Sequence, residues 1–416
     1  MSERVPRGWQ AFNLGDLASK IEGGGTPSRT LPEYWGGDIP WATVKDLKGV
    51  RLTSTLESIT QIGLEQSASK LVPANTMIIA SRMAVGKAVI FNKDVAINQD
   101  LKAFFPKKTL ETQYLLQWYL SKAEVIESLG TGSTVKGIKL DDIRTLPIDL
   151  PSLPEQQKIA KILTSVDEVI EKTQAQIDKL KDLKTGMMQE LLTKGVGVDG
   201  KPHTEFKDSP VGRIPKAWLV KELGELASFV TSGSRGWAQY YSESGPIFIR
   251  IGNLTREHIN FRFNDIIRVT PPDSAEGKRT LVESGDVLIS ITADLGVIAV
   301  VNDDIREAYV NQHVSLVRLK DKGISRWVGH FLSFDNSQKQ FSANNDSGAK
   351  AGLNLNAIRK TLIAVPTFAE MSLIVKTLDS MDSRIAVSRK RLSKVVELKK
   401  ALMQDLLTGK VRVTID

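Results

Sequence analysis

The sequence contains no cysteine and only four histidines among its 416 residues. Without cysteine, the chain has no disulfide bonds, no thiolate zinc sites and no cysteine nucleophile. This usage fits a reducing compartment, so we expect the protein in the cytoplasm. The histidines lack the short spacings of metal-ligand motifs, and we expect no metal site in this chain. They are His203, His258, His313 and His330.

Long apolar runs and a secretory start are also missing. The first ten residues, MSERVPRGWQ, include no hydrophobic stretch of the kind found in a signal peptide. The two most apolar segments, residues 76–91 and 287–301, are interrupted by charged side chains. We therefore expect neither segment to span a bilayer.

Motifs of the common catalytic sites are absent or incomplete. The segment GTGSTVKGIK (130–139) has two glycines at the spacing of a phosphate-binding loop, but Ile138 stands where the lysine belongs. The segment PPDSAEGK (271–278) resembles a nuclease motif, but its acidic residues lie in a proline-led loop rather than on neighbouring strands. The sequence also has no G-x-S-x-G elbow and no Asn-Pro-Pro-aromatic segment of an amino-methylating enzyme. It therefore predicts no active site.

What the sequence does have is length for several domains and an excess of basic residues. A chain of 416 residues suggests two to four domains. Its content of 41% apolar and 25% charged residues is that of an ordinary globular protein. The formal net charge of +8 and the pI near 9.3 give modest support to an acidic partner such as nucleic acid.

One phrase occurs twice in the chain. Residues 183–195 read LKTGMMQELLTKG and residues 398–410 read LKKALMQDLLTGK, a shift of 398 − 183 = 215 residues. At the same shift, GIKLDDIR (137–144) lies over GLNLNAIR (352–359). Earlier matches, at slightly smaller shifts, join 75–90 to 285–300 and 8–19 to 217–228. The chain is therefore two copies of one unit, each about 200 residues long.

The front and the back of each copy have different patterns. The front contains short β-branched and aromatic runs, such as DIPWATVKDL and TMIIASRM, separated by Gly, Pro and Asn. This pattern predicts a strand-rich mixed domain. In the back, apolar residues recur at alternating intervals of four and three, which is typical of a coiled-coil helix.

The apolar stripes of the two predicted helices are equivalent. The first comprises Ile159, Leu163, Val166, Ile170, Ile177, Leu180, Met187 and Leu191; the second comprises Ile374, Leu378, Met381, Ile385, Leu392, Val395, Leu402 and Leu406. Polar residues interrupt both stripes at the same places, Thr173 and Lys184 in the first and Ser388 and Lys399 in the second. These interruptions either fix the register of a helix pair or are simply inherited from the duplicated ancestor. Because each helix is roughly 60 Å long, we expect the two stripes to bury each other.

The predicted fold class is α+β. Two similar strand-rich mixed α/β domains, here called heads, are separated by an antiparallel two-helix coiled coil with a pseudo-two-fold internal duplication. We expect the first head at 1–151, the first long helix at 152–194, a linker at 195–214, the second head at 215–365, the second long helix at 366–410 and a tail at 411–416.

Four segments of the chain are typical of one protein family. They are RGWQAFNLGDLASKIEGGGTPSR (7–29), LPIDLPSLPEQQKIAKIL (146–163), LKTGMMQELLTKG (183–195) and FKDSPVGRIPKAW (206–218). Through them, the chain resembles the specificity subunit of type I restriction–modification enzymes over essentially its whole length. The second copy departs from the family pattern at PTFAEMSLI (366–374), which keeps Pro366 and Glu370 but lacks the paired glutamines.

The resemblance implies a non-catalytic scaffold whose heads are target-recognition domains, each reading half of a bipartite site in double-stranded DNA. It also implies that the helices dock two modification subunits, which are adenine methyltransferases carrying S-adenosylmethionine. Restriction subunits, which are endonucleases and translocases, would join later, and ATP and Mg would be bound by partner subunits, not by this chain. Two alternatives stay open, a DNA-modifying enzyme and a coiled-coil protein-interaction scaffold without DNA binding.

The duplication suggests which residues read bases. If the heads read different half-sites, equivalent loop residues that differ are candidates for base contacts. We expect these at Thr26, Ser28, Arg29, Arg82 and Lys87 in the first head and at Ser234, Arg235, Trp237 and Thr292 in the second, with Lys136, Lys139 and Lys350 suited to phosphate. The shared pairs Asn98-Gln99 and Asn311-Gln312 are expected to be structural. A basic cluster, Arg389, Lys390, Arg391 and Lys394, is either a solvated face or a contact with DNA or an acidic partner.

Overall fold

The computed structural model describes most of the chain and divides it into two compact units. The described residues are 5–132, 135–197, 201–233, 235–344 and 352–415. The first unit consists of residues 1–175 and 390–416, and the second consists of residues 176–389. Within the described ranges, no helix combines the length and the apolar character that a bilayer span requires.

The head of the first unit is built on two sheets and a strand pair, β1 with β11. The larger sheet has the order β2-β10-β7-β8-β4, and the smaller has the order β5-β3-β9-β6. The strands are β1 (Gln10–Asn13), β2 (Ala18–Gly23), β3 (Trp35–Ala42), β4 (Arg51–Leu52), β5 (Glu57–Ile59), β6 (Lys70–Val72), β7 (Met77–Ala80), β8 (Ala88–Phe91), β9 (Val95–Ile97), β10 (Leu101–Pro106) and β11 (Pro147–Leu150). The short helices are α1 (Gln61–Glu65), α2 (Thr112–Ser121), α3 (Ala123–Leu129) and α4 (Leu140–Arg144).

The central strands of the larger sheet are covered on both faces. β7 and β8 read MIIA and AVIF, and all eight residues are buried. Since successive side chains of a strand point to opposite faces, Met77 and Ile79 enter a core shared with α2. Ile78 and Ala80 enter a second core, shared with strands of the smaller sheet. The continuous apolar runs seen in the sequence are therefore doubly covered strands.

The second unit contains the second head and a small strand pair, β12 with β13. Its sheets have the orders β15-β21-β18-β19 and β17-β16-β20, and β14 pairs with β22. The strands are β12 (Phe206–Lys207), β13 (Ile214–Pro215), β14 (Leu219–Glu222), β15 (Ala227–Ser232), β16 (Tyr241–Ile249), β17 (Ile267–Val269), β18 (Val287–Ser290), β19 (Ile298–Val300), β20 (Ala308–Val310), β21 (Val314–Leu319) and β22 (Leu362–Val365). The short helices are α6 (Leu223–Leu226), α7 (Ala275–Thr280), α8 (Ser325–Ser333), α9 (Asp335–Ala343) and α10 (Leu355–Lys360).

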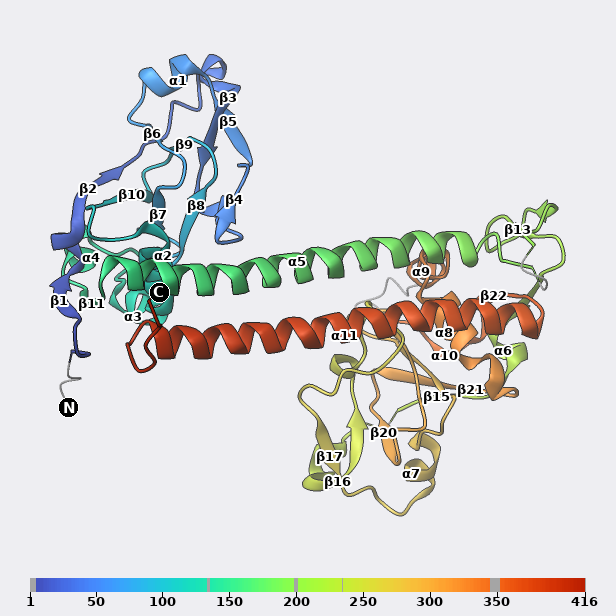
Figure 1. Cartoon of the computed structure of the whole chain (residues 1–416). Coiled ribbons are helices and arrows are strands. Elements are labelled where there is room, and N and C mark those ends of the chain that lie inside the picture. The colour runs from blue at the N-terminus through green and yellow to red at the C-terminus, as the bar shows by residue number, and fades with distance from the viewer. Residues whose placement is uncertain (1–4, 133–134, 198–200, 234, 345–351, 416) are drawn as a thin grey trace. The chain divides into compact units, whose positions relative to one another are not determined.

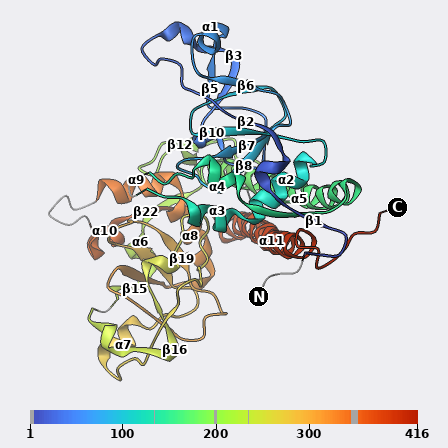
Figure 2. The ribbon, with the colours of Figure 1, turned by 90° about the vertical axis from the view of Figure 1, so that its left-hand side faces the viewer.

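The two heads share one topology. The order β15-β21-β18-β19 repeats β2-β10-β7-β8, and the pair β14 with β22 repeats β1 with β11. The parallel pair of β3 and β9 recurs as β16 and β20. In each unit, the smaller sheet lies at the end of the head that is farthest from the long helices (Figure 1 and Figure 2). The repeated topology confirms the predicted α+β class with two strand-rich mixed domains from an internal duplication.

The long helices are α5 (Leu153–Leu191) and α11 (Phe368–Leu406), with 39 residues each. Each helix contributes one half to each unit. The acidic residues Glu155 and Glu370 lie in their first turns, where a negative charge is favoured by the helix dipole. Within each unit, the half of α5 lies beside the half of α11 (Figure 1).

Polar pairs on the helix seam show that the two helices run antiparallel. In the first unit, Asp167 of α5 pairs with Lys399 of α11 at 2.6 Å. In the second unit, Lys184 pairs with Asp382 at 2.5 Å. The members of the two pairs are equivalent at the 215-residue shift, so each stripe lysine meets the aspartate that comes from the other copy. These buried pairs favour the register-fixing interpretation of the polar interruptions, because any other register would leave buried charges unpaired.

The apolar stripe residues are buried or half-buried along both helices. In the first unit, Ile159, Leu163 and Leu406 share the core of the head. In the second unit, Ile374 and Leu378 do the same. The remaining stripe residues also have reduced exposure: Val166, Ile170, Ile177, Leu180, Met187, Leu191, Met381, Ile385, Leu392, Val395 and Leu402. Each half-helix pair therefore also completes the core of its own head.

The missing glutamines of the second copy have a structural explanation. Gln156, next to Glu155, accepts a hydrogen bond from the Glu111 N–H and donates to the carbonyl oxygens of Thr109 and Pro151. Its equivalent at the 215-residue shift, Met371, is 5% exposed and belongs to the apolar core of the second unit. The hydrogen bonds of Gln156 in the first copy are therefore replaced in the second copy by the apolar packing of Met371. The second long helix still begins at the equivalent place.

Candidate nucleic-acid interface

Four loops of the first head come together in what we call the first loop junction. It comprises residues 24–29, 81–87, 98–100 and the described part of 131–139. The Thr26 hydroxyl donates to Gln99 Oε1 at 2.5 Å, joining the first loop to the third. The Met83 N–H donates to the Lys136 carbonyl at 2.9 Å, joining the second loop to the fourth. The glycine-rich loop, the β7–β8 turn and the basic segment before α4 thus form one surface.

The second head has an equivalent second loop junction. It comprises the described part of residues 232–237, and residues 291–297, 311–313 and 352–354. Side chains of these loops, including Arg235, Thr292 and Gln312, line a hollow of about 310 Å³. The hollow is open to solvent and offers hydrogen-bonding groups of both kinds, which suits the edge of a base pair.

The backbone framework of the two junctions is the same. Asn98 Oδ1 accepts the N–H of Asp100 at 3.1 Å, and Asn311 Oδ1 accepts the N–H of His313 at 3.1 Å. Both asparagines are buried, at 5% and 7% exposure. The two shared asparagines therefore have the structural role that the sequence predicted, whereas Gln99 is exposed.

Glycine allows the close approach of the first loop in each head. A Cβ atom on Gly24 would lie 1.9 Å from the Ile97 carbonyl oxygen, and one on Gly233 would lie 2.0 Å from the Asn311 carbonyl oxygen. In the neighbouring β-hairpin turns, Met83 and Ala293 occupy the same position with φ of 64° and 57°. A left-handed conformation at a non-glycine residue costs free energy, so its presence in both copies marks a turn that is kept for its shape.

Arg29 is paired within the first head rather than presented as a free cation, although its side chain is 53% exposed. Its guanidinium pairs with both carboxylate oxygens of Glu57, one of them at 2.9 Å. It also lies 3.7 Å from the centre of the Trp35 ring. The hydrogen bonds between the two side chains raise the pKa of Arg29 and lower the pKa of Glu57. Next to it, the hydroxyls of Ser28 and Thr30 are 2.8 Å apart.

The other basic candidates of the first head are exposed or partly exposed, and they are loosely paired. Arg82 Nη1 lies 3.7 Å from Asp100 Oδ1, and Lys136 Nζ lies 3.7 Å from Glu127. Lys87 and Lys139 are exposed, and Lys87 Nζ donates to the Leu47 carbonyl at 3.2 Å. These four cations are accessible to an anionic ligand, as the interpretation of the loops requires. The four are Arg82, Lys87, Lys136 and Lys139.

In the second head, the structure corrects one candidate and leaves two outside its scope. Trp237 is only 2% exposed and stacks on Phe248, with ring centres 5.4 Å apart. Its ring is part of the head's core, so the expectation that it reads DNA is wrong for this conformation. Ser234 and Lys350 lie outside the described residues. Arg235 is exposed at the hollow.

Sequence reasoning missed two residues of the junctions, Asp100 and His313. Asp100 lies beside Arg82, and His313 Nδ1 lies 2.7 Å from the Thr292 hydroxyl. The signal was present, because both residues directly follow the shared Asn-Gln pair and differ between the copies. Each of the two residues therefore lies beside a predicted candidate of its own head, Asp100 beside Arg82 and His313 beside Thr292.

The basic cluster of the second helix is only partly free. Arg389 makes two hydrogen bonds to Glu257, at 2.6 and 2.7 Å, and this bonding lowers the pKa of Glu257. Lys390, Arg391 and Lys394 are exposed. Arg389 thus ties the helix to its own head, whereas the other three side chains face solvent.

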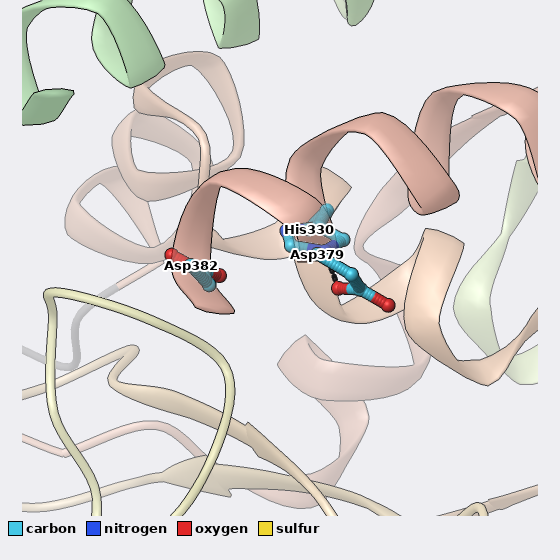
Figure 3. A group of neighbouring side chains, drawn as sticks. All are labelled: His330, Asp379 and Asp382. Atoms are coloured by element: carbon cyan, nitrogen blue, oxygen red, sulfur yellow. Dashed lines mark hydrogen bonds and ion pairs between the residues drawn. The ribbon is translucent and has the colours of Figure 1, made fainter. Parts of the chain in front are cut away.

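One group of side chains among the described residues is close enough to hold a metal ion, but it is an ion-pair network. His330, Asp379 and Asp382 bring their ligand atoms within 4.8 Å of one another (Figure 3). Asp379 accepts from His330 Nε2 at 2.8 Å and from Arg326 at 2.5 and 2.6 Å. Asp382 is paired with Lys184. Since two basic side chains already balance both carboxylates, no cation is needed there.

The comparisons with known proteins agree with this arrangement. Residues 6–182 and 215–397 match the family model described as the type I restriction modification DNA specificity domain. The MjaVIII specificity subunit of a type I restriction enzyme from Methanocaldococcus jannaschii is 25% identical over 416 residues, covering 99% of this chain and 94% of that one. The MjaIX specificity subunit from the same organism is 28% identical over 263 residues, which is 61% of this chain and 60% of that one.

A solved structure has the same fold. The type I restriction–modification S subunit from M. genitalium aligns with a TM-score of 0.63 and 15% identity, covering 98% of this chain and 97% of that one. The family model matches both copies of the internal duplication, each with its head and a large part of its long helix. The chain therefore belongs to the family of type I restriction modification DNA specificity proteins, as its resemblance predicted.

Proposed function

We propose that this chain is the DNA sequence-recognition subunit of a type I restriction–modification complex, and that each head reads one half of a bipartite site. The two loop junctions carry this proposal. They hold equivalent loops on the same backbone framework but present different side chains from them. Reading two different half-sites requires this combination of a common scaffold and different base-contacting groups. The net charge of +8 supports an anionic partner.

The two long helices set the spacing between the half-sites in this proposal. Each helix has 39 residues, which corresponds to about 58 Å at 1.5 Å per residue. Equivalent faces of B-DNA recur about every 34 Å, so a helix of this length is on the scale of the one-turn separation of half-sites. The buried pairs Lys184–Asp382 and Lys399–Asp167 keep this spacing constant by fixing the helix register.

The chain is the non-catalytic part of the proposed complex. Two modification subunits, which methylate adenine with S-adenosylmethionine, dock on the helices, and restriction subunits with ATP and Mg join them in the cytoplasm. The relatives are named as specificity subunits of type I restriction enzymes, which supports this division of labour. A subunit of this kind recognises the site and leaves the chemistry to its partners.

The helices present the same exposed face in both units, which suits two identical partners. Three exposed residues of α5 in the second unit are identical to three exposed residues of α11 in the first unit at the 215-residue shift. The pairs are Lys179 with Lys394, Leu183 with Leu398, and Gln189 with Gln404. In each helix they lie on one side, away from the apolar stripe. Leu183 and Leu398 are 52% and 53% exposed.

Packing does not explain why these residues are identical. Exposed neighbours have diverged between the copies, for example Thr185 and Lys400. A shared partner surface explains identity at exposed positions, because two copies of one subunit need the same contacts in both places. We therefore assign the Lys179–Leu183–Gln189 face and its equivalent on α11 to the docking of one modification subunit each.

An exchange of heads tests the proposed function. Residues 1–150 are replaced by the corresponding head of another family member, and the chain is expressed with its modification subunits. One half of the methylated site should change and the other should stay the same, because each loop junction belongs to one head. Methylome sequencing reads both halves in one experiment, and the unmodified chain with the same subunits is the control.

Two results would contradict the proposal. A change in both halves of the site would show that the heads do not read separately. A native chain that shows no salt-dependent binding of duplex DNA, as phosphate contacts would produce, would favour a scaffold that binds only proteins.

A further inference from the structure

A side chain of the β-hairpin turn and its neighbour form an equivalent pair in both heads. In the first head, Arg82 Nη1 lies 3.7 Å from Asp100 Oδ1. In the second head, the Thr292 hydroxyl lies 2.7 Å from His313 Nδ1. Arg82 and Thr292 occupy the same place after the central strands β7 and β18, and Asp100 and His313 both follow the shared Asn-Gln pair.

The backbone holds both pairs in the same way. The Ser81 N–H donates to the Asp100 carbonyl at 2.8 Å, and the Ile291 N–H donates to the His313 carbonyl at 3.0 Å. The residue after each of these donors is the first member of the pair, and it forms an isolated bridge to a glycine: Arg82 to Gly137 and Thr292 to Gly352. The frame is therefore constant, and only the two side chains differ.

Both members of the pair differ together. The first head has a cation beside an anion, and the second has a hydroxyl beside an imidazole. Exchanging one member alone would place Arg82 beside an imidazole or Thr292 beside a carboxylate. In each head the two side chains contact each other, and both differ between the heads although the surrounding backbone is the same. This pattern is expected of two groups that act jointly.

We propose that Arg82–Asp100 and Thr292–His313 are the coupled specificity determinants of the two heads. The turn residue contacts the edge of a base pair, and its neighbour is a positioning residue that orients it. This inference rests on the proposed function, since it assigns the residues by which each head reads its half-site.

Arg82 has the chemistry to read guanine. Its side chain is 55% exposed, whereas that of Asp100 is 13% exposed. The carboxylate is thus fixed in the head and occupies only one edge of the guanidinium, which has five N–H donors. The remaining donors match the O6 and N7 acceptors of guanine in the major groove. The half-site of the first head is therefore expected to contain a guanine at the position that Arg82 reaches.

Thr292 reads its base differently. Its hydroxyl belongs to a row of hydrogen-bonding side chains, because His313 Nδ1 lies 2.7 Å from the hydroxyl and His313 Nε2 lies 2.9 Å from Gln312 Nε2. Thr292 and Gln312 of this group line the hollow of about 310 Å³ in the second loop junction. A threonine hydroxyl cannot make the two-donor contact with guanine, but its methyl group can pack on the methyl group of thymine. The two heads therefore prefer different bases at equivalent positions.

Exchanging the pair tests this inference. We would compare the native chain with Arg82→Thr, Asp100→His and the double variant R82T/D100H, each in complex with the modification subunits, by methylome sequencing. R82T and the double variant should lose the preference for guanine at one position of the first half-site, by about 5- to 150-fold. D100H should weaken the preference less, since it removes only the orienting group. The second half-site should be unchanged in all variants.

A matched control is available on the same head. Arg144 is 49% exposed and pairs with Asp141 at 3.1 Å, outside the loop junction. R144T/D141H should leave both half-sites unchanged. A motif that is the same for R82T/D100H as for the native chain would overturn the pair while leaving the proposed function intact, whereas a native complex without a bipartite motif would overturn the proposed function itself.

Loss of all methylation has a defined follow-up. The purified complexes are then used to select duplexes from a library in which the first half-site is randomised and the second is kept. Selection of guanine by R82T/D100H as strongly as by the native complex overturns the inference, and loss of that selection supports it.

Discussion

Each unit contains a buried carboxylate at the start of its long helix, and the two units surround this carboxylate with different polar groups. Glu155 and Glu370 are equivalent at the helix starts, and both are buried, at 2% and 1% exposure. Glu155 binds Arg412, a half-exposed side chain in the tail, at 2.6 and 2.8 Å. Glu370 instead accepts hydrogen bonds from two backbone N–H groups and from side chains of the linker and of Trp218. The second unit has therefore placed more buried groups around the same carboxylate.

The two units also differ in their polar groups at a second pair of equivalent positions. Gln117 of α2 donates to Asp167 at 2.6 Å in the first unit. His330 of α8 occupies the corresponding place in the second unit and donates to Asp379 at 2.8 Å. A neutral amide has been replaced by a group that titrates near neutral pH. The donor position is thus kept but its acceptor differs, because the residue equivalent to Asp167 is Asp382 and not Asp379. The stability of the two units therefore comes to depend on different conditions.

The largest expected effect is on stability, when the buried carboxylate at either helix start is removed. Glu370→Ala should lower the free energy of unfolding of the second unit by about 4 kcal/mol, because it leaves several buried donors without an acceptor. Glu155→Ala should cost the first unit only about 2 kcal/mol, since Arg412 can turn to water. Urea unfolding of the full chain, with hydrogen exchange resolved by peptide, measures each unit separately. Equal losses in the two units would show that the additional donors around Glu370 contribute nothing.

The pH dependence of this difference follows from Glu370. Burial alone would raise its pKa, but the hydrogen bonds from Gly197, His203, Val196 and Trp218 outweigh burial and lower the pKa. A carboxylate with a lowered pKa in the folded state stabilises the fold above its unfolded pKa, and this contribution is lost as the pH falls through the folded value. The cost of E370A should therefore shrink at acidic pH.

Much of the architecture could be predicted from the sequence, because it depends on periodicity and repetition. The alternating spacing of four and three identified both long helices, and the shift of 215 residues identified the two heads. Both signals extend over tens of residues, so single exceptions do not change them. The pairing partners of Lys184 and Lys399 could not be predicted in the same way, since they are fixed only when the two helices take one register.

The loop residues were harder to predict for a different reason. A tryptophan in a glycine-rich loop has the same sequence signal whether it faces DNA or the core, and only the packing of Trp237 on Phe248 decides between them. Arg29 is similarly ambiguous, because Glu57 lies 28 residues away in the chain. Side-chain partners that are distant in sequence leave no local pattern, so composition could indicate the loops but not the role of each residue.

A smaller effect is expected where the two units are alike. Leu183→Glu and Leu398→Glu should each weaken the binding of one modification subunit by about 2 kcal/mol, or about 30-fold, by placing a charge in an apolar contact. Native mass spectrometry of the complex should show one modification subunit lost in either variant and both lost in the double variant. Val396→Glu is the control, since Val396 is 48% exposed but is not shared with the other copy.

The outcome of this experiment separates two explanations of the shared residues. If L183E and L398E bind both modification subunits as tightly as V396E does, the identity at these positions reflects inheritance, and the docking surface lies elsewhere. If only one of the two variants loses a subunit, the partners do not dock symmetrically.

The smallest expected effect concerns the titration of His330. Burial lowers the pKa of His330, against the opposing effect of its hydrogen bond with Asp379. The unfolded chain therefore takes up a proton near pH 6.5 that the folded chain does not bind, and the second unit loses stability as the pH falls below that value. Below about pH 4 a further loss follows, because hydrogen bonds from His330 and Arg326 outweigh burial and lower the pKa of Asp379 to about 2.

His330→Gln gives the second unit the amide that the first unit has at Gln117. The variant should keep the hydrogen bond to Asp379. Between pH 7 and pH 5, the free energy of unfolding of its second unit should fall by about 1–2 kcal/mol less than that of the native chain. Urea unfolding at pH 7, 6 and 5, with hydrogen exchange followed in peptides from α8 and α2, measures this difference. His258, whose pKa burial also lowers, is retained in both proteins, so the difference between them isolates His330. If the native chain and H330Q lose the same stability over this range, His330 binds its proton equally well in the folded and unfolded chains, and the difference between the units at this position has no consequence for their pH dependence.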